Sequence, residues 1–155
     1  MIKKPYLFIF LFIFTYSCGF KVIKQEEIRN FNIGELVLLG DNKVNFFLKK
    51  RILREKIDGK QPIKLTLESK KVKIIKEKNI SRRVLKNEIR ITVIVNYSLI
   101  GSKVSNNFKI TRSGIVSVGL RHSVTVKKER ILIEDLSRKI ADAINENLIN
   151  QINEL

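Results

Sequence analysis

A single cysteine, Cys18, ends a short apolar run near the start of the 155-residue chain. Two lysines precede the run, which is unbroken Leu, Phe and Ile over 7–14, and Ser17 stands directly before the cysteine. A basic segment, an apolar segment and a small residue before cysteine are typical of an export signal whose cleavage leaves the thiol free to carry a lipid. We therefore expect residues 1–17 to be a lipoprotein signal peptide and Cys18 to be the lipidated residue.

The apolar run is too short to cross a membrane as a helix. At about 1.5 Å per residue, roughly ten apolar residues cover about half of a ~30 Å hydrocarbon core. An uncleaved anchor, or an ordinary signal peptide with Cys18 as an incidental buried thiol, stays an alternative. Because the chain has only one cysteine, a disulfide framework is excluded, and acylation is the chemistry that this position favours.

The other residues that could do chemistry form no pattern typical of an enzyme. His122 is the only histidine, and we interpret it as an exposed polar residue beside Arg121 in a predicted loop. The seven glycines form no phosphate-binding loop, and the aspartates lack the spacing of metal ligands. The aspartates considered are Asp41, Asp58, Asp135 and Asp142. We expect no catalytic residue, no metal and no cofactor.

The chain without its signal peptide is strongly basic. Two of the 31 basic residues fall in 1–17, which leaves 29 against 15 acidic residues and a formal charge of +14 over 138 residues. This length is enough for one hydrophobic core, so we expect a single domain over 31–155. The charge predicts an anionic partner, namely nucleic acid, phospholipid or a phosphorylated glycolipid, and the export signal argues against nucleic acid.

Hydrophobic periodicity predicts the elements of the first half of this domain. Residues 18–30 are polar after the cysteine and are interpreted as a tether. A strand over 31–39 is expected next, and after a turn at 40–42 a helix follows from Val44 to Ile57. The helix carries two apolar stripes, of which the second is interpreted as a partner-facing surface or as a helix end folded under a loop. The second stripe consists of Phe46, Leu53 and Ile57.

Three further strands and a closing helix are expected in the rest of the chain. At Ser69-Lys70-Lys71 the apolar positions shift by one residue, which predicts a bulge or a turn. The expected strands are 63–67, 89–99 and 104–110, with 115–118 either continuing the last strand or beginning a loop, and the helix spans Lys128 to Gln151. The fold class is therefore α+β, a two-layer sandwich of about four mainly antiparallel strands covered by two helices in the order β-α-β-β-β-α.

Basic residues expected in loops at a sheet end are the best candidates for an anion site. They are Lys70, Lys71, Arg82, Arg83 and Arg112. Adjacent arginines favour phosphate because the planar guanidinium binds it with two parallel hydrogen bonds. The alternative interpretation is solvated surface charge without a ligand.

Four segments, in their order and in their spacing from the cysteine, resemble the LPS-assembly lipoprotein LptE family. They are Cys18-Gly19-Phe20, the strand over 31–39 with its helix from Val44, the hairpin strand Glu88 to Leu99 before Gly101, and Glu134 to Ile144 in the closing helix. Together they span nearly the whole chain after the signal peptide. The chain departs from the family at Tyr16 of the signal and at 21–23, where related members often carry a Pro-Leu-Tyr-like stretch.

The resemblance implies a protein without enzymatic activity that is anchored by its lipid at the periplasmic face of the outer membrane. It would plug the LptD β-barrel, help that barrel to assemble, and bind lipopolysaccharide, whose phosphates would be the anionic ligand. Gly19 after the cysteine is compatible with passage to the outer membrane. The alternative from another class is a lipoprotein adaptor or pilot protein for another envelope complex, with the basic surface binding anionic phospholipid.

Overall fold

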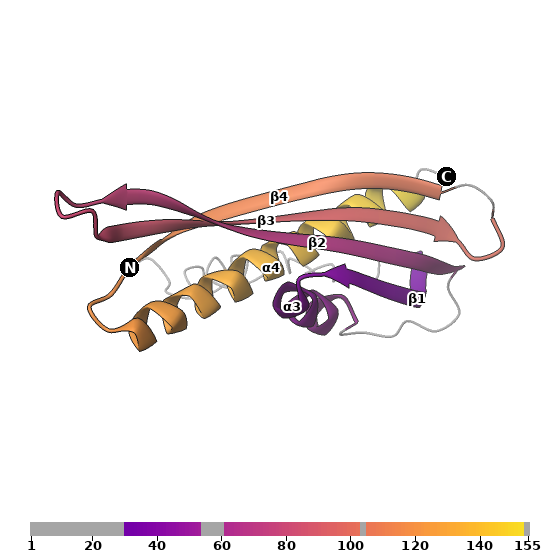
Figure 1. Ribbon diagram of the computed structural model, residues 1–155. Coiled ribbons are helices and arrows are strands. Elements are labelled where there is room, and N and C mark those ends of the chain that lie inside the picture. Colours follow the sequence, from indigo (N-terminus) through magenta and orange to yellow (C-terminus); the bar gives the residue numbers. More distant parts are fainter. Residues whose placement is uncertain (1–29, 54–60, 103–104, 154–155) are drawn as a thin grey trace, which may run out of the picture.

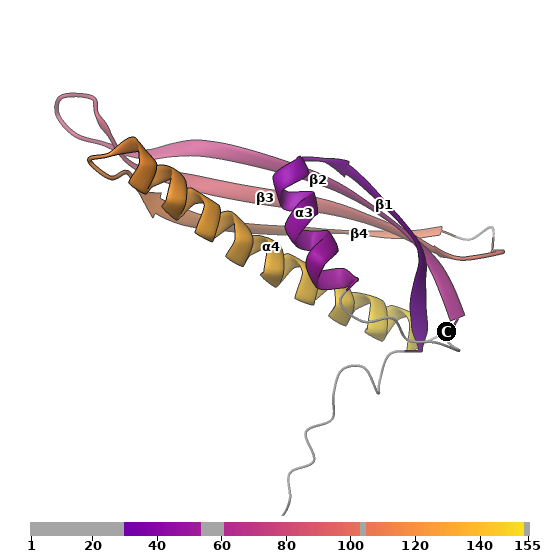
Figure 2. The same ribbon diagram turned by 90° about the horizontal axis from the view of Figure 1, so that it is seen from below.

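A computed structural model describes residues 30–53, 61–102 and 105–153. Four strands form one sheet in the order β1-β2-β3-β4, and two helices cover one of its faces (Figures 1 and 2). β1 is parallel to β2, whereas β2, β3 and β4 are antiparallel neighbours. The elements are β1 (Phe31–Gly40), α3 (Asn42–Ile52), β2 (Gln61–Lys78), β3 (Val84–Leu99), β4 (Ser105–Ser117) and α4 (His122–Asn153). The predicted α+β sandwich and its element order are confirmed.

Some predictions fall on parts of the chain that lie outside the described residues. These are the signal peptide over 1–17, the lipidated Cys18, the tether before Asn30, and Ile57 of the second helical stripe. In the described ranges, neither helix is long and apolar enough to cross a membrane.

The core lies between the inner face of the sheet and the two helices. α4 runs along β3 and β4, and α3 packs against both α4 and the β1–β2 side of the sheet (Figure 2). The four-residue spacing predicted for α4 is confirmed, because the stripe from Leu136 to Leu148 is buried against the sheet. The first apolar stripe predicted for α3 consists of Val44, Phe47, Leu48 and Ile52. Val44, Leu48 and Ile52 are at most 2% exposed, and Phe47 is partly buried against the core.

The bulge or turn predicted at Ser69-Lys70-Lys71 is wrong. β2 continues without a register shift as far as Ile75, and its inward face changes from apolar to polar at Ser69. Beyond that point, two inward-facing lysines are paired with acidic residues of the covering layer: Lys71 with Asp41 and Lys73 with Glu129. The apolar pattern shifts by one residue because Lys71 and Lys73 take the inward positions as charged pairs. The apolar Val72 between them lies on the open face of the sheet.

Several element bounds also differ from those predicted. β3 begins at Val84, β4 continues through Ile115 to Ser117, and α4 begins at His122. His122 is exposed, as expected, but it is the first helical residue and does not lie in a loop. The helix extends to this point because the hydroxyl of Thr125 accepts a hydrogen bond of 2.9 Å from the backbone N–H of Gly119, which closes the chain reversal before α4.

A polar cluster joins the end of β1 to the middle of β2. The carboxylate of Asp41 accepts hydrogen bonds from the backbone N–H groups of Lys43 and Val44, so it caps α3. The second oxygen of the same carboxylate lies 2.7 Å from the Lys71 ammonium. Beneath it, the buried Asn45 side chain accepts a hydrogen bond of 2.7 Å from the Ser69 hydroxyl. This cluster fixes where α3 begins on the sheet.

Asp41 is expected to make stability depend on pH. Burial raises the pKa of its carboxyl, but the hydrogen bonds from Lys71 and from the backbone of Val44 outweigh it and hold the pKa below its ordinary value. The charged form therefore stabilises the fold above pH about 4, and this contribution is lost as pH falls through that value and below. Asp41→Asn keeps a capping oxygen and removes the charge. We expect it to lower the free energy of unfolding by about 0.5–1 kcal/mol at pH 7.

Urea unfolding of the wild type and Asp41→Asn at pH 7 and at pH 3 measures this effect. The difference between the two proteins should shrink at pH 3, where the wild-type carboxyl is increasingly protonated. A difference that stays constant with pH would contradict a role for the charge.

Candidate functional site

The end of the molecule where β2 turns into β3 is strongly basic. We call it the basic tip and define it as residues 73–88 together with 118–130. The two stretches meet there, since the backbone N–H of Val118 donates a 2.8 Å hydrogen bond to the carbonyl of Leu85. In Figure 1 they form the end of the sheet at which α4 begins. The tip thus combines the β2–β3 turn, the β4–α4 connection and the first turns of α4.

The β2–β3 turn positions Arg82 and Arg83. The Asn79 side chain accepts a 2.7 Å hydrogen bond from the backbone N–H of Arg83, and the Asn79 carbonyl accepts one of 2.9 Å from Arg82. Arg82 adopts a φ of 60°, a conformation that favours glycine. An arginine held in a costly backbone conformation at an exposed turn is typical of a residue kept for a function rather than for stability.

Charge at the basic tip is unbalanced. It contains ten basic and three acidic residues, and each of the three acids is already in an ion pair. The hydrogen bond from Lys76, with a second from Arg90, holds the pKa of Glu88 below its ordinary value. This carboxylate therefore stays charged and paired with these two side chains. Seven cations have no acidic partner among the described residues. They are Lys78, Arg82, Arg83, Arg121, Lys127, Lys128 and Arg130.

The structure separates the other predicted basic candidates from this tip. Lys70 and Lys71 lie in the middle of β2 on opposite faces of the sheet, and Lys71 is committed to Asp41. Their predicted place in a loop at a sheet end is therefore wrong. Arg112 lies opposite Ile91 within β4, five residues and about 17 Å of strand before its end. Of the five candidates, only Arg82 and Arg83 occupy a turn at a sheet end, and their binding role stays a prediction.

Sequence reasoning missed the basic residues at the start of α4, including Arg121, Lys127 and Lys128. The sequence predicts a loop at Arg121 and His122 and a helix that begins at Lys128, whereas α4 begins at His122, so these basic residues are not predicted to lie together. The signal that could have placed them is the chain reversal at Gly119, which brings the start of α4 back beneath the β2–β3 hairpin.

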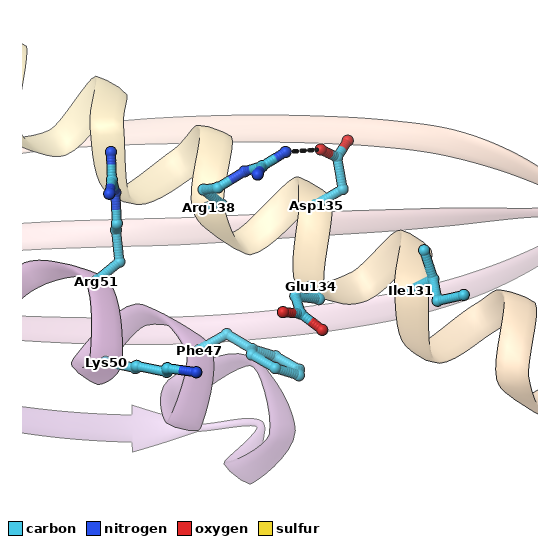
Figure 3. Close-up of a pocket in the computed structure, with 7 residues that line it drawn as sticks. All are labelled: Phe47, Lys50, Arg51, Ile131, Glu134, Asp135 and Arg138. Carbon is cyan, nitrogen blue, oxygen red and sulfur yellow. Dashed lines mark hydrogen bonds and ion pairs between the residues drawn. The ribbon is translucent and has the colours of Figure 1, made fainter.

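A second candidate region is the open cleft between the two helices, with a volume of about 890 Å³. Phe47 and Lys50 of α3 lie on one side of it and Glu134 of α4 on the other (Figure 3). One ion pair joins the two helices, because Arg51 contacts Asp142 at 2.7 Å, and within α4 Asp135 contacts Arg138 and Lys139. The hydrogen bonds from Lys139 and Arg138 hold the pKa of Asp135 below its ordinary value. Three of the five charged residues that line this cleft, Arg51, Asp135 and Arg138, are therefore in ion pairs.

The predicted partner-facing stripe lies on the outside of α3. Phe46 is 63% exposed and contacts the ring of Phe47 edge-on at a centroid distance of 5.3 Å. Leu53, directly after the helix, is 41% exposed. Both side chains are thus exposed within the described structure. Residues 54–60, which follow the helix, lie outside the described residues, so the partner-facing surface and the helix end folded under a loop both stay predictions.

No cluster of His, Cys, Asp and Glu side chains in 30–53, 61–102 and 105–153 is suited to hold a metal ion. The arrangement supports binding chemistry: a cationic end that can pair with phosphate, and exposed apolar side chains on one helix.

Comparisons with known proteins give a consistent fold. The chain matches no protein-family model and no curated protein. Among solved structures it is similar to rare lipoprotein B from Shewanella oneidensis, with a TM-score of 0.58 and 14% identity over 77% of this chain and 97% of that one. A candidate lipoprotein from Caulobacter crescentus gives a TM-score of 0.60 and 13% identity, covering 83% of this chain and 96% of that one.

The uncharacterised lipoprotein B from Nitrosomonas europaea is also similar, with a TM-score of 0.54 and 15% identity over 87% of this chain and 93% of that one. Each likeness covers nearly the whole of the other protein, so the shared fold is the complete domain. The resemblance to the LPS-assembly lipoprotein family is confirmed at the level of the fold, because rare lipoprotein B structures have this architecture.

Proposed function

We propose that this protein is an LptE-type lipoprotein of lipopolysaccharide assembly, anchored through Cys18 at the periplasmic face of the outer membrane. It plugs an LptD-type β-barrel, helps that barrel to assemble, and binds lipopolysaccharide during its insertion at the cell surface. It acts by binding and has no catalytic role. The observation that carries the proposal is the fold shared over whole domains with rare lipoprotein B and two other lipoproteins.

The lipoprotein signal supports the proposal from an independent direction. The fold likeness concerns the described residues, whereas the basic, apolar and small residues that lead to Cys18 lie in the part of the chain before them. A lipid at Cys18 would place the domain at a membrane surface. The two observations agree, since the similar structures include proteins named as lipoproteins.

The basic tip supports lipopolysaccharide as the ligand. Arg82 and Arg83 present two guanidinium groups from one turn, and Arg121 begins the opposite side of the tip. Lipid A carries phosphate groups, which guanidinium recognises with paired, charge-assisted hydrogen bonds. Cations without acidic partners are the ones available for such contacts, because forming the contacts breaks no existing ion pair.

The exposed apolar side chains of α3 support a protein partner. Phe46 is a large aromatic residue with most of its surface in solvent, and aromatic residues are enriched where protein interfaces form. We assign this surface to the barrel because it exposes the apolar side chains of Phe46 and Leu53, which exposed lysines of α3 flank. We assign the basic tip to the lipid because cations without acidic partners are gathered there.

Phe46→Glu is expected to reduce recovery of the barrel with the tagged lipoprotein by about tenfold or more, since a buried aromatic anchor commonly contributes about 2 kcal/mol or more to an interface. The measurement is purification of the full-length protein from detergent-solubilised outer membrane, with mass spectrometry of the proteins recovered at stoichiometric yield. Wild type should recover a large β-barrel.

Phe46→Leu serves as the matched control, because it keeps an apolar side chain at the same position and should retain the barrel. Equal recovery with Phe46→Glu would remove α3 from the interface. Recovery of a different envelope complex by the wild type, with no barrel, would replace the proposal by the adaptor function.

A further inference from the structure

A cleft of about 600 Å³ opens beneath the basic tip, between the ends of β2 and β3 and the first turns of α4. Ile75 and Asn87 line its sheet side, where they oppose each other across the β2–β3 ladder. Val118 and Leu120 enter from the β4–α4 connection, and Val126 enters from α4. Figure 2 shows that this end of the sheet faces the start of α4, whereas α3 lies nearer the middle of the sheet.

Five of the eleven residues that line this cleft are aliphatic, and three of these five are exposed. Ile75 is 52% exposed, Leu120 is 90% exposed and Val126 is 43% exposed. They lie beyond the packed core, so within the described structure they have solvent on one side. Apolar surface gathered in a concave site is the usual composition of a ligand pocket.

Three of the five polar side chains that line the cleft are paired, and the other two are Asn87 and the exposed His122. The Lys73 ammonium contacts the Glu129 carboxylate, and the buried Thr125 hydroxyl accepts its hydrogen bond from Gly119. A ligand inside the cleft would meet five aliphatic side chains and one internally paired Lys–Glu couple, while the cations without acidic partners lie outside the lining, elsewhere in the basic tip. An apolar interior below a cationic rim complements a molecule with a hydrocarbon chain and an anionic head.

The size of the cleft agrees with one acyl chain. A methylene group is about the size of a water molecule, whose share of liquid volume is about 30 Å³, so a chain of about 12 to 14 carbons needs roughly 400 Å³. The cleft is therefore large enough for one such chain and too small for a second chain beside it.

We propose that this cleft holds one acyl chain of lipopolysaccharide, while Arg82, Arg83 and Arg121 contact its phosphates at the rim. The inference rests on the proposed function, because it names where the hydrocarbon part of the same ligand is bound. It adds a chain site to the phosphate contacts and predicts that substitutions inside the cleft affect binding without changing any charge.

Two valines of α4 allow a matched test. Val126 lines the cleft and Val124 does not, yet both are 43% exposed and they lie two residues apart on the same helix. A photoreactive benzoyl-phenylalanine is placed at 126 or at 124 in the full-length lipoprotein, and cells are irradiated. Its benzophenone inserts into nearby C–H bonds, and mass spectrometry identifies the adducts. We expect a lipopolysaccharide adduct at 126 at several times the yield at 124.

A second pair of variants measures the contribution of the cleft to binding. Val126→Phe fills the cleft, and we expect it to lower the amount of lipopolysaccharide retained by the purified protein by about tenfold, as for a few methylene groups left unburied. Val124→Phe makes the same change outside the cleft and should retain the wild-type amount.

The outcomes separate this inference from the proposed function. Equal adduct yields at the two positions, or a peptide adduct at 126, would overturn the acyl-chain site. So would retention of lipopolysaccharide that depends on Arg82 and Arg83 but is unchanged by Val126→Phe, and in that case the proposed function stands. A phospholipid adduct at 126, from a protein that retains no lipopolysaccharide, would overturn the ligand assignment and the proposed function together.

Discussion

Replacing Arg82 and Arg83 together by glutamate is expected to lower lipopolysaccharide binding by about 10- to 100-fold. Each arginine can contribute charge-assisted hydrogen bonds to phosphate, worth about 1.5–3 kcal/mol when desolvated and less at an exposed turn screened by salt. Glutamate also adds repulsion to the same phosphates. The turn itself should persist, because it is held by backbone groups and by the Asn79 side chain. The measurement is lipopolysaccharide bound per mole of purified protein, at two salt concentrations.

A control with the same change in net charge shows whether position matters. Lys43→Glu with Lys109→Glu alters two exposed lysines that lie away from the tip, one at the start of α3 and one within β4. This variant should keep most of the binding. If both double variants bind equally, overall charge rather than the basic tip attracts the ligand.

Arg82→Gly separates binding from stability. Arg82 has a φ of 60°, so glycine removes a steric cost of about 1 kcal/mol at this position. This gain roughly offsets the larger conformational entropy that glycine loses on folding. We expect the free energy of unfolding to stay the same or to rise by up to about 1 kcal/mol, while lipopolysaccharide binding falls. A loss of binding in a protein that is no less stable cannot result from unfolding.

The architecture could be predicted from the sequence because its signals are local. The four-residue spacing along α4 and the strict alternation from Ile89 to Leu99 each follow from one buried face and one exposed face. The order of these elements then leaves few ways to cover a single sheet. The resemblance drawn from the same segments was confirmed in the fold.

The predictions that were wrong concern places where polar residues occupy the inner face. On β2, the inward positions after Ser69 are taken by Lys71 and Lys73, and a pattern based on apolar residues reads them as outward-facing. Their acidic partners, Asp41 and Glu129, are 30 and 56 residues away in the sequence. No local pattern contains such pairs, so the true phase of the strand required the tertiary structure.

The candidate site was only partly predictable for a related reason. Arg82 and Arg83 could be placed because they precede a strong strand, so a turn was the natural interpretation. Arg121 joins them only because β4 ends beside Leu85 and the chain then reverses into α4. The acyl-chain cleft depends on the same meeting of two connections. Residues of β2, β3, the β4–α4 connection and α4 line it, and none of them is unusual in its own local sequence.

Gly40→Ala is expected to lower the free energy of unfolding by about 3 kcal/mol or more, the range reached when a change overpacks a tight site and breaks hydrogen bonds. A Cβ at this position would lie 1.9 Å from the Ser69 carbonyl oxygen and 2.9 Å from its carbonyl carbon, both backbone atoms of the neighbouring strand. The φ of 92° adds conformational strain. The same Ser69 carbonyl accepts the 3.1 Å hydrogen bond from the N–H of Asp41, so relief of the clash would disturb the cap of α3.

Gly101→Ala is the matched control for this substitution, because Gly101 has a φ of 93° and no atom lies within 4 Å of the place that an alanine methyl group would occupy. Gly101→Ala should lower the free energy of unfolding by about 1 kcal/mol, which is the cost of the backbone conformation alone. Urea unfolding measures the free energy of unfolding of both variants. Because both glycines have a similar φ, the difference between the two losses reports the close approach of β1 to β2 and not the backbone strain. Equal losses would mean that the Gly40–Ser69 contact relaxes freely. A larger loss at Gly40 would identify this contact as the constraint that sets where α3 begins, and hence where Phe46 is presented on the outside of the fold.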